Sequence, residues 1–148
     1  MIRVVLVDDQ TLVRQGIRAL LALGDDIADI EIVGEAADGD EAVEVIRRER
    51  PDAVLLDVRM PHKNGIDVLR ALKSSDELPP TILLTTFDDD EALLDGMKAG
   101  ARGYLLKDVS LERLTEAIRI VARGGTLIRP AVTETALRGF DQIGRAHV

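Results

Sequence analysis

The sequence contains no cysteine and no tryptophan, and aromatic residues make up only 2% of its 148 positions. The absence of cysteine excludes disulfides and thiolate metal sites, which is compatible with the reducing cytoplasm. No apolar run approaches the roughly 20 residues that a membrane helix needs, and the first residues lack the pattern of a signal peptide. We therefore expect a soluble, cytoplasmic protein.

Basic residues are also in the minority. Lysine and arginine number 19 against 27 acidic residues, which gives a formal net charge of -8 and a pI near 4.8. Such a surface repels phosphate backbones, so this chain on its own should be a poor nucleic-acid binder. Its length allows one domain with a proper hydrophobic core.

Five short apolar runs are separated by segments with helical periodicity. The predicted strands are residues 4–7, 30–36, 53–57, 81–85 and 103–106, and the predicted helices follow them, beginning near residues 10, 38, 66, 88 and 110. Strands that alternate with helices predict an α/β fold, in which a parallel sheet is covered on both faces. Right-handed crossovers make that sheet doubly wound.

Residues typical of helix ends support these boundaries. Asp38 and Glu41 have the spacing of a capping box at the start of the second helix, and Pro51 stops that helix. Ser110 is predicted to cap the last helix.

Polar side chains stand where four of the predicted strands end. Asp8 and Asp9 follow the first strand, Asp57 ends the third, Thr85 ends the fourth and Lys107 follows the fifth. The carboxyl ends of parallel strands share one edge, where ligands bind in open α/β sheets. Clustered carboxylates repel one another, and Mg²⁺, which prefers oxygen ligands, relieves that repulsion. A carboxylate beside Mg²⁺, an ammonium and a hydroxyl is equipped to accept a phosphoryl group and form an aspartyl phosphate.

Each residue taken singly has a simpler interpretation. A lone aspartate at a strand end is usually a turn or cap residue, and Asp9 could cap the helix that follows it. Tyr104 is more often explained by packing, and the isolated histidines His62 and His147 receive no role. The prediction depends on four strand ends that carry compatible groups at one edge.

These motifs make the first 125 residues resemble the receiver domain of a two-component response regulator. The resemblance rests on Val7-Asp8-Asp9, Leu56-Asp57-x-x-Met60-Pro61-x-x-x-Gly65, Leu84-Thr85-Thr86 and Gly103-Tyr104-Leu105-Leu106-Lys107. It implies a flavodoxin-like sheet of order 2-1-3-4-5. It also implies phosphorylation by a sensor histidine kinase.

The resemblance assigns a role to each matching residue. Asp57 would be the phosphoacceptor, and Mg²⁺ would be bound by Asp8, Asp9, Asp57 and the backbone carbonyl of Arg59. Lys107 would pair with the phosphoryl group, while Thr85 moves toward it and Tyr104 swings inward. Such a switch would act on the surface formed by the fourth helix, fifth strand and fifth helix, where receivers commonly dimerise or meet partners.

Two features point to a branch of the family and to its kinetics. Many receivers have proline after the lysine, often with a cis bond, whereas this chain has Asp108, which leaves the isomer open. Lys107-Asp108 and Leu84-Thr85-Thr86-Phe87-Asp88 are similar to the LuxR/NarL-type transcriptional branch. Because Arg59 and Phe87 occupy positions that influence water access in this family, we expect a longer phosphoryl lifetime than in an Arg59→Asn, Phe87→Ala variant.

The segment after Gly125 resembles the exit from the receiver in LuxR-type regulators, and we expect residues 126–142 to be a linker toward a helix-turn-helix domain. Residues 143–148, Ile-Gly-Arg-Ala-His-Val, match the translation of ATC GGA AGA GCA CAC GTC, which resembles a common sequencing adapter. We therefore expect a non-native tail and a missing DNA-binding domain, which would be the only route to DNA. A true single-domain receiver that acts by protein contact is the alternative.

A Mg²⁺-dependent phosphatase is the alternative from another class of protein. Such enzymes use an Asp-x-Asp motif, in which the second aspartate acts as acid and base, but this chain has Arg59 at that position. They also need a capping insertion, for which no segment is long enough. We therefore expect a self-catalysed phosphoacceptor that also dephosphorylates itself, and not an enzyme that turns over a separate substrate.

Overall fold

The computed structural model describes residues 1–23, 29–86 and 90–128, and strands alternate with helices along them. The elements are β1 (Ile2–Val7), α1 (Thr11–Leu23), β2 (Ile30–Ala36), α2 (Gly39–Glu49), β3 (Ala53–Asp57), α3 (Gly65–Ser74), β4 (Thr81–Thr85), α4 (Asp90–Lys98), β5 (Gly103–Leu106), α5 (Leu111–Ala122) and β6 (Leu127–Ile128). All five predicted strands and all five predicted helices are present. Most of the predicted linker and all of the predicted tail lie outside the described residues.

The strands form one parallel sheet in the order β2-β1-β3-β4-β5-β6. This confirms the predicted order 2-1-3-4-5 and adds a strand at one edge. The added strand, β6, pairs Leu127 with Gly103 and Ile128 with Tyr104. Two residues are too few to show the periodicity from which a strand is predicted, so the sequence pattern placed them in the linker.

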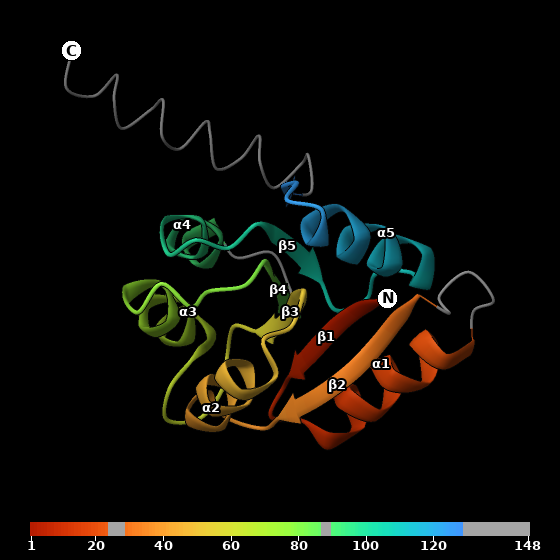
Figure 1. Cartoon of the computed structure of the whole chain (residues 1–148), viewed down its shortest axis with the longest axis horizontal. Helices are drawn as coiled ribbons and strands as arrows, with labels where there is room; N and C mark the ends of the chain where they lie inside the picture. The colour runs from red at the N-terminus through yellow and green to blue at the C-terminus, as the bar shows by residue number, and fades with distance from the viewer. Residues whose placement is uncertain (24–28, 87–89, 129–148) are drawn as a thin grey trace, which may run out of the picture.

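The helices cover both faces of the sheet, as Figure 1 shows: α2, α3 and α4 lie on one side, and α1 and α5 on the other. Two hydrophobic cores result, because successive side chains of a strand point to opposite faces. Val5 and Val7 of β1 belong to the core beneath α2, α3 and α4. Val4 and Leu6 belong to the core beneath α1 and α5. The central strands are thus buried on both faces, as their unbroken apolar runs predicted.

A bulge in β2 changes which face its last residues occupy. The register with β1 shifts between Val4 and Val5, so Val33 has no partner of its own in that strand. Ile32 packs in the core beneath α1 and α5 before the bulge. Regular alternation would place Glu35 on the opposite face, but the extra residue returns it to the side of α1.

The helix caps partly follow the predictions. Asp38 accepts a hydrogen bond from the amide of Glu41 at 2.8 Å, but the Glu41 carboxylate binds the amide of Ala37 at 3.3 Å and not that of Asp38. One half of the predicted capping box is therefore formed. Ser110 caps α5 as predicted, through a 3.2 Å bond from the amide of Arg113.

A complete capping box, which the sequence pattern had not singled out, begins α3. The Asn64 side chain accepts a hydrogen bond from the Asp67 amide at 2.9 Å, and the Asp67 carboxylate accepts one from the Asn64 amide at 3.1 Å. These two bonds fix the point where the loop after β3 enters its helix.

Candidate phosphoacceptor and cation site

The polar residues predicted at the strand ends come together at one edge of the sheet. Asp8, Asp57 and Thr85 are 0%, 4% and 3% exposed, so these polar groups are held inside the fold. A depression of about 170 Å³ opens at this edge and is lined by Asp9, Gln10, Asp57, Arg59, Thr85, Thr86 and Lys107. The structure therefore confirms that the predicted groups are neighbours; the functions predicted for them stay predictions.

Lys107 connects two of the carboxylates. Its Nζ lies 2.8 Å from Asp8 Oδ2 and 3.2 Å from Asp57 Oδ2, while its backbone amide donates to the Thr85 carbonyl at 2.7 Å. Burial would lower the pKa of Lys107, but the charges of Asp8 and Asp57 outweigh it and raise that pKa. The Lys107 side chain is consequently protonated and positively charged at neutral pH.

The charge state of Asp57 is set by opposing effects. Burial, followed by repulsion from Asp8, raises the pKa of Asp57 to about 6, although Lys107 and the amide of Arg59 act in the other direction. The Arg59 amide donates to Asp57 Oδ1 at 3.3 Å. Asp57 is therefore mostly ionised at pH 7, but its negative charge is only partly neutralised by its neighbours.

Asp8 is tied to its surroundings through several of its atoms. Its amide donates to the Ala36 carbonyl at 3.1 Å, and its Oδ1 accepts the amide of Gln10 at 2.8 Å. Its buried Oδ2 accepts no well-oriented hydrogen bond, although the Lys107 ammonium lies 2.8 Å away. An oxygen with this remaining acceptor capacity is suited to a cation.

Three carboxylates could share such a cation. Asp8, Asp9 and Asp57 each offer an oxygen atom, and these atoms lie within 4.8 Å of one another. Oxygen-only ligands, two of them buried and one exposed, fit Mg²⁺, which keeps several water molecules when protein carboxylates bind it. The alternative interpretation of Asp9 as a helix cap finds no support in the described part of the chain, where its carboxylate accepts no hydrogen bond.

The loop after β3 folds back over Asp57. The amide of Gly65 donates to the Val58 carbonyl at 2.9 Å. A Cβ atom at Gly65 would lie 2.5 Å from the Asp57 carbonyl oxygen and 3.1 Å from Val58 Cα, so a side chain there would displace the backbone that carries Asp57. The sequence showed Gly65 as part of the motif that begins at Leu56 and Asp57, but it did not show this contact, because a close approach between two backbone segments leaves no periodic signal.

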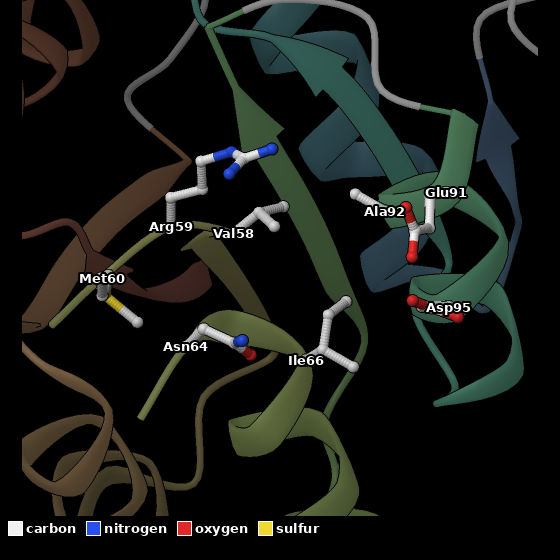
Figure 2. A pocket seen from close by; sticks show the side chains of 8 residues that line it. All are labelled: Val58, Arg59, Met60, Asn64, Ile66, Glu91, Ala92 and Asp95. Atoms are coloured by element: carbon white, nitrogen blue, oxygen red, sulfur yellow. The ribbon is translucent and has the colours of Figure 1, made fainter. Parts of the chain in front are cut away.

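A second hollow, of about 420 Å³, adjoins the site between this loop and α4. It is lined by Val58, Arg59, Met60, Asn64, Ile66, Glu91, Ala92 and Asp95. In Figure 2, Glu91 and Asp95 lie on α4, across the hollow from Asn64 and Ile66. Arg59 borders both depressions. Phe87, the other residue of the lifetime prediction, lies outside the described residues.

Two further expectations concern β5 and the residue after Lys107. Tyr104 is 2% exposed and packs in the core beneath α2, α3 and α4, which is an inward position. The movement predicted for Tyr104 stays a prediction. The described residues contain no cis peptide bond, so Lys107 and Asp108 are joined in the trans form.

The fold and the cluster at the strand ends define a receiver-like protein with a flavodoxin-like sheet. Residues 4–119 match the family model described as the response regulator receiver domain. The chain therefore belongs to the response regulator receiver family. Among residues 1–23, 29–86 and 90–128, no helix has the length and apolar character needed to cross a membrane.

Two similar curated proteins are named as transcriptional regulatory proteins. The chain is 42% identical to the uncharacterised transcriptional regulatory protein YxjL of Bacillus subtilis, over 98% of this chain and 64% of that protein. It is 34% identical to DegU of Brevibacillus brevis, over 96% of this chain and 59% of that protein. The chain thus spans only about three fifths of the length of these two relatives.

Solved structures give the same family. The receiver domain of NarL from Mycobacterium tuberculosis is similar with a TM-score of 0.77 and 35% identity, over 83% of this chain and 97% of that one. A LuxR-family response regulator from Aurantimonas sp. SI85-9A1 is similar with a TM-score of 0.84 and 29% identity, over 94% of this chain and 97% of that one.

Proposed function

We propose that this protein is a phosphorylation-controlled response regulator that accepts a phosphoryl group on Asp57. The observation that carries the proposal is the position of the Asp57 carboxylate, which opens to the 170 Å³ depression with the Lys107 ammonium 3.2 Å away. Membership of the receiver family supports the same assignment.

The chemistry assigns a separate task to each group. A carboxylate oxygen of Asp57 attacks the phosphorus atom of the donor, the bond from phosphorus to the donor breaks, and the leaving group keeps the electron pair. Asp57 is ready for attack at pH 7 because its pKa of about 6 leaves most of it ionised. Lys107 pairs with the phosphoryl oxygens, and the Thr85 hydroxyl donates a hydrogen bond to one of them.

A bound Mg²⁺ would supply positive charge that offsets the charge of the transferring oxygens. Asp8, Asp9 and Asp57 would hold it, together with the backbone carbonyl of Arg59. The protein would act on its own side chain, once per phosphoryl group, and hydrolysis of the aspartyl phosphate would return it to the starting state. In that sense it is a self-modifying switch and not a turnover enzyme.

The family and its relatives support a proposal for the donor and for the output. We propose a sensor histidine kinase as the donor, and a surface of α4, β5 and α5 as the part that changes and supports dimerisation when Thr85 and Tyr104 move. Because the relatives are transcriptional regulators, we propose a transcriptional output. A chain of net charge -8 is unsuited to bind DNA itself. We therefore propose that residues 1–125 are the receiver, which would control a separate DNA-binding domain through a linker of residues 126–142. Residues 143–148 would be a non-native tail. We place the protein in the cytoplasm.

Intact mass spectrometry after incubation with acetyl phosphate and Mg²⁺ tests the proposal. The wild type should gain the mass of one phosphoryl group, and the Asp57→Ala variant should gain none. Equal labelling of the two proteins would move the phosphoacceptor elsewhere. Omitting Mg²⁺ provides a control, because labelling of the wild type should then become slow.

A further inference from the structure

One guanidinium group on α1 connects three parts of the molecule beside the cation site. Arg14 Nη1 donates to the backbone carbonyl of Asp8, and its Nη2 donates to Thr11 Oγ1 at 3.3 Å. Its Nε lies 3.6 Å from Glu35 Oε1 at the end of β2. The Arg14 side chain is only 16% exposed, so the group is packed in place as well as bonded.

The carbonyl that Arg14 holds belongs to the peptide between Asp8 and Asp9. The amide and Oδ1 of Asp8 have partners of their own, and its Oδ2 lies beside Lys107. Asp9 is exposed, and within the described residues its carboxylate accepts no hydrogen bond. The direction in which Asp9 points therefore depends on the orientation of its backbone, and Arg14 fixes the peptide immediately before it.

Glu35 anchors this arrangement from the sheet. The bulge at Val33 turns Glu35 toward α1, where it binds Arg14 through Oε1 and accepts a 2.7 Å hydrogen bond from Arg18 Nη1 through Oε2. Arg18 is one helical turn further along α1 and 54% exposed. The two arginines thus share one carboxylate, but only Arg14 also reaches the loop that carries Asp8 and Asp9.

We propose that Arg14 is a positioning residue for the divalent cation: it holds the Asp8 carbonyl and so keeps Asp9 directed into the carboxylate cluster. The inference rests on the proposed function, since it takes Asp9 as a cation ligand. Groups that orient metal ligands without touching the metal typically change metal affinity by about 10- to 100-fold when they are removed. If Arg14 served only to tie α1 to β2, its loss would leave cation affinity unchanged.

Calorimetric titration of Mg²⁺ into the full chain tests this role without relying on phosphorylation. In Arg14→Met we expect the dissociation constant for Mg²⁺ to rise by about tenfold. Arg18→Met is the matched control, because it removes an arginine from the same carboxylate and leaves the Asp8 carbonyl bonded. Its dissociation constant should stay within about twofold of the wild-type value.

Lysine variants keep the test decisive if Arg14→Met does not fold, as judged by circular dichroism. A lysine at position 14 offers one ammonium, which cannot hold the Asp8 carbonyl, Thr11 and Glu35 together as the planar guanidinium does. Arg14→Lys should therefore bind Mg²⁺ more weakly than Arg18→Lys does. Equal affinities in either matched pair would overturn the inference. A wild type that binds no Mg²⁺ at millimolar concentration would instead overturn the proposed metal site, and the inference with it.

Discussion

The ammonium of Lys107 lies 3.2 Å from the carboxylate of Asp57, but this attraction does not set the protonation of Asp57 by itself. Burial and the charge of Asp8 outweigh it and raise the pKa of Asp57 to about 6. The side chain proposed to accept the phosphoryl group is therefore held in an environment that disfavours its own charge. Such an environment costs stability, and the cost can be measured.

Replacing Asp57 with asparagine should stabilise the cation-free protein at neutral pH. Because the folded-state pKa of about 6 exceeds the usual value of 3.8, the folded protein binds more protons than the unfolded chain between these values. The contribution of protonated Asp57 to the free energy of unfolding is therefore fully present below about pH 4 and is lost as the pH rises through 6. Allowing for solvent screening, we expect the free energy of unfolding of Asp57→Asn to exceed that of the wild type by about 1–2 kcal/mol at pH 7.

Urea unfolding in the presence of EDTA, at several pH values between 4 and 7.5, checks this expectation. The difference in unfolding free energy between Asp57→Asn and the wild type should grow with pH. A difference that is the same at both ends of the range would show that the Asp57 charge is not destabilising.

Mg²⁺ should stabilise the wild type, and Asp9→Asn should remove that effect without weakening the fold. A ligand present at 100 times its dissociation constant stabilises the native state by about 2.7 kcal/mol. Because Asp9 is exposed and its carboxylate accepts no hydrogen bond within the described residues, the variant should match the wild type in EDTA. Thermal melts with and without Mg²⁺ provide the comparison, and an equal Mg²⁺-dependent rise in both proteins would argue against Asp9 as a ligand.

Two glycine-to-alanine variants should have effects of opposite sign. An alanine Cβ at position 65 would meet the Asp57 carbonyl at 2.5 Å, and such overpacking typically costs about 1–3 kcal/mol. At Gly16 on α1, nothing lies within 4 Å of the added atom, so alanine should raise stability by up to about 1 kcal/mol through helix propensity. Chemical denaturation measures both changes. Gly65→Ala should also slow labelling by acetyl phosphate. If this variant were as stable and as readily labelled as the wild type, the close approach of Gly65 to the Asp57 carbonyl would be contradicted.

Lys107→Met should slow phosphoryl transfer to Asp57. Removing one group that stabilises a transition-state oxygen typically lowers a rate by on the order of 10²- to 10³-fold, and we expect a loss at the lower end of that range. Lys63→Met is a suitable control, since Lys63 lies in the loop after β3 and pairs with Asp40 at 3.2 Å, not with Asp57. The rate of labelling by acetyl phosphate distinguishes them, and equal rates in the two variants would remove Lys107 from the proposed chemistry.

The sequence was sufficient to predict the elements that depend on short-range patterns. Unbroken apolar runs identified the central strands, and the residue types at their ends identified Asp8, Asp57, Thr85 and Lys107 as neighbours. The remaining features depend on contacts between distant segments. The bulge at Val33 moves Glu35 to the side of α1, and this follows from pairing with β1 and not from the composition of β2.

The same limit applies to residues whose partner is a backbone atom. Arg14 has the appearance of an ordinary exposed-face arginine of an amphipathic helix, yet its guanidinium reaches the Asp8 carbonyl. Gly65 could be recognised as part of a motif, but not the reason for a glycine there, which is that the Asp57 carbonyl, eight positions earlier in the chain, leaves no room for a side chain. Side-chain periodicity carries no information about such contacts, so they become visible only in three dimensions.

Chemical trapping of the phosphorylated residue tests the central claim most directly. Borohydride reduces an aspartyl phosphate to homoserine and releases phosphate, so the modified position can be read from peptide masses. After treatment with acetyl phosphate and Mg²⁺, followed by borohydride, we predict homoserine at position 57 and at no other aspartate. Homoserine at another position, or an unmodified Asp57 in protein that has gained a phosphoryl group, would contradict the assignment of Asp57 as the phosphoacceptor.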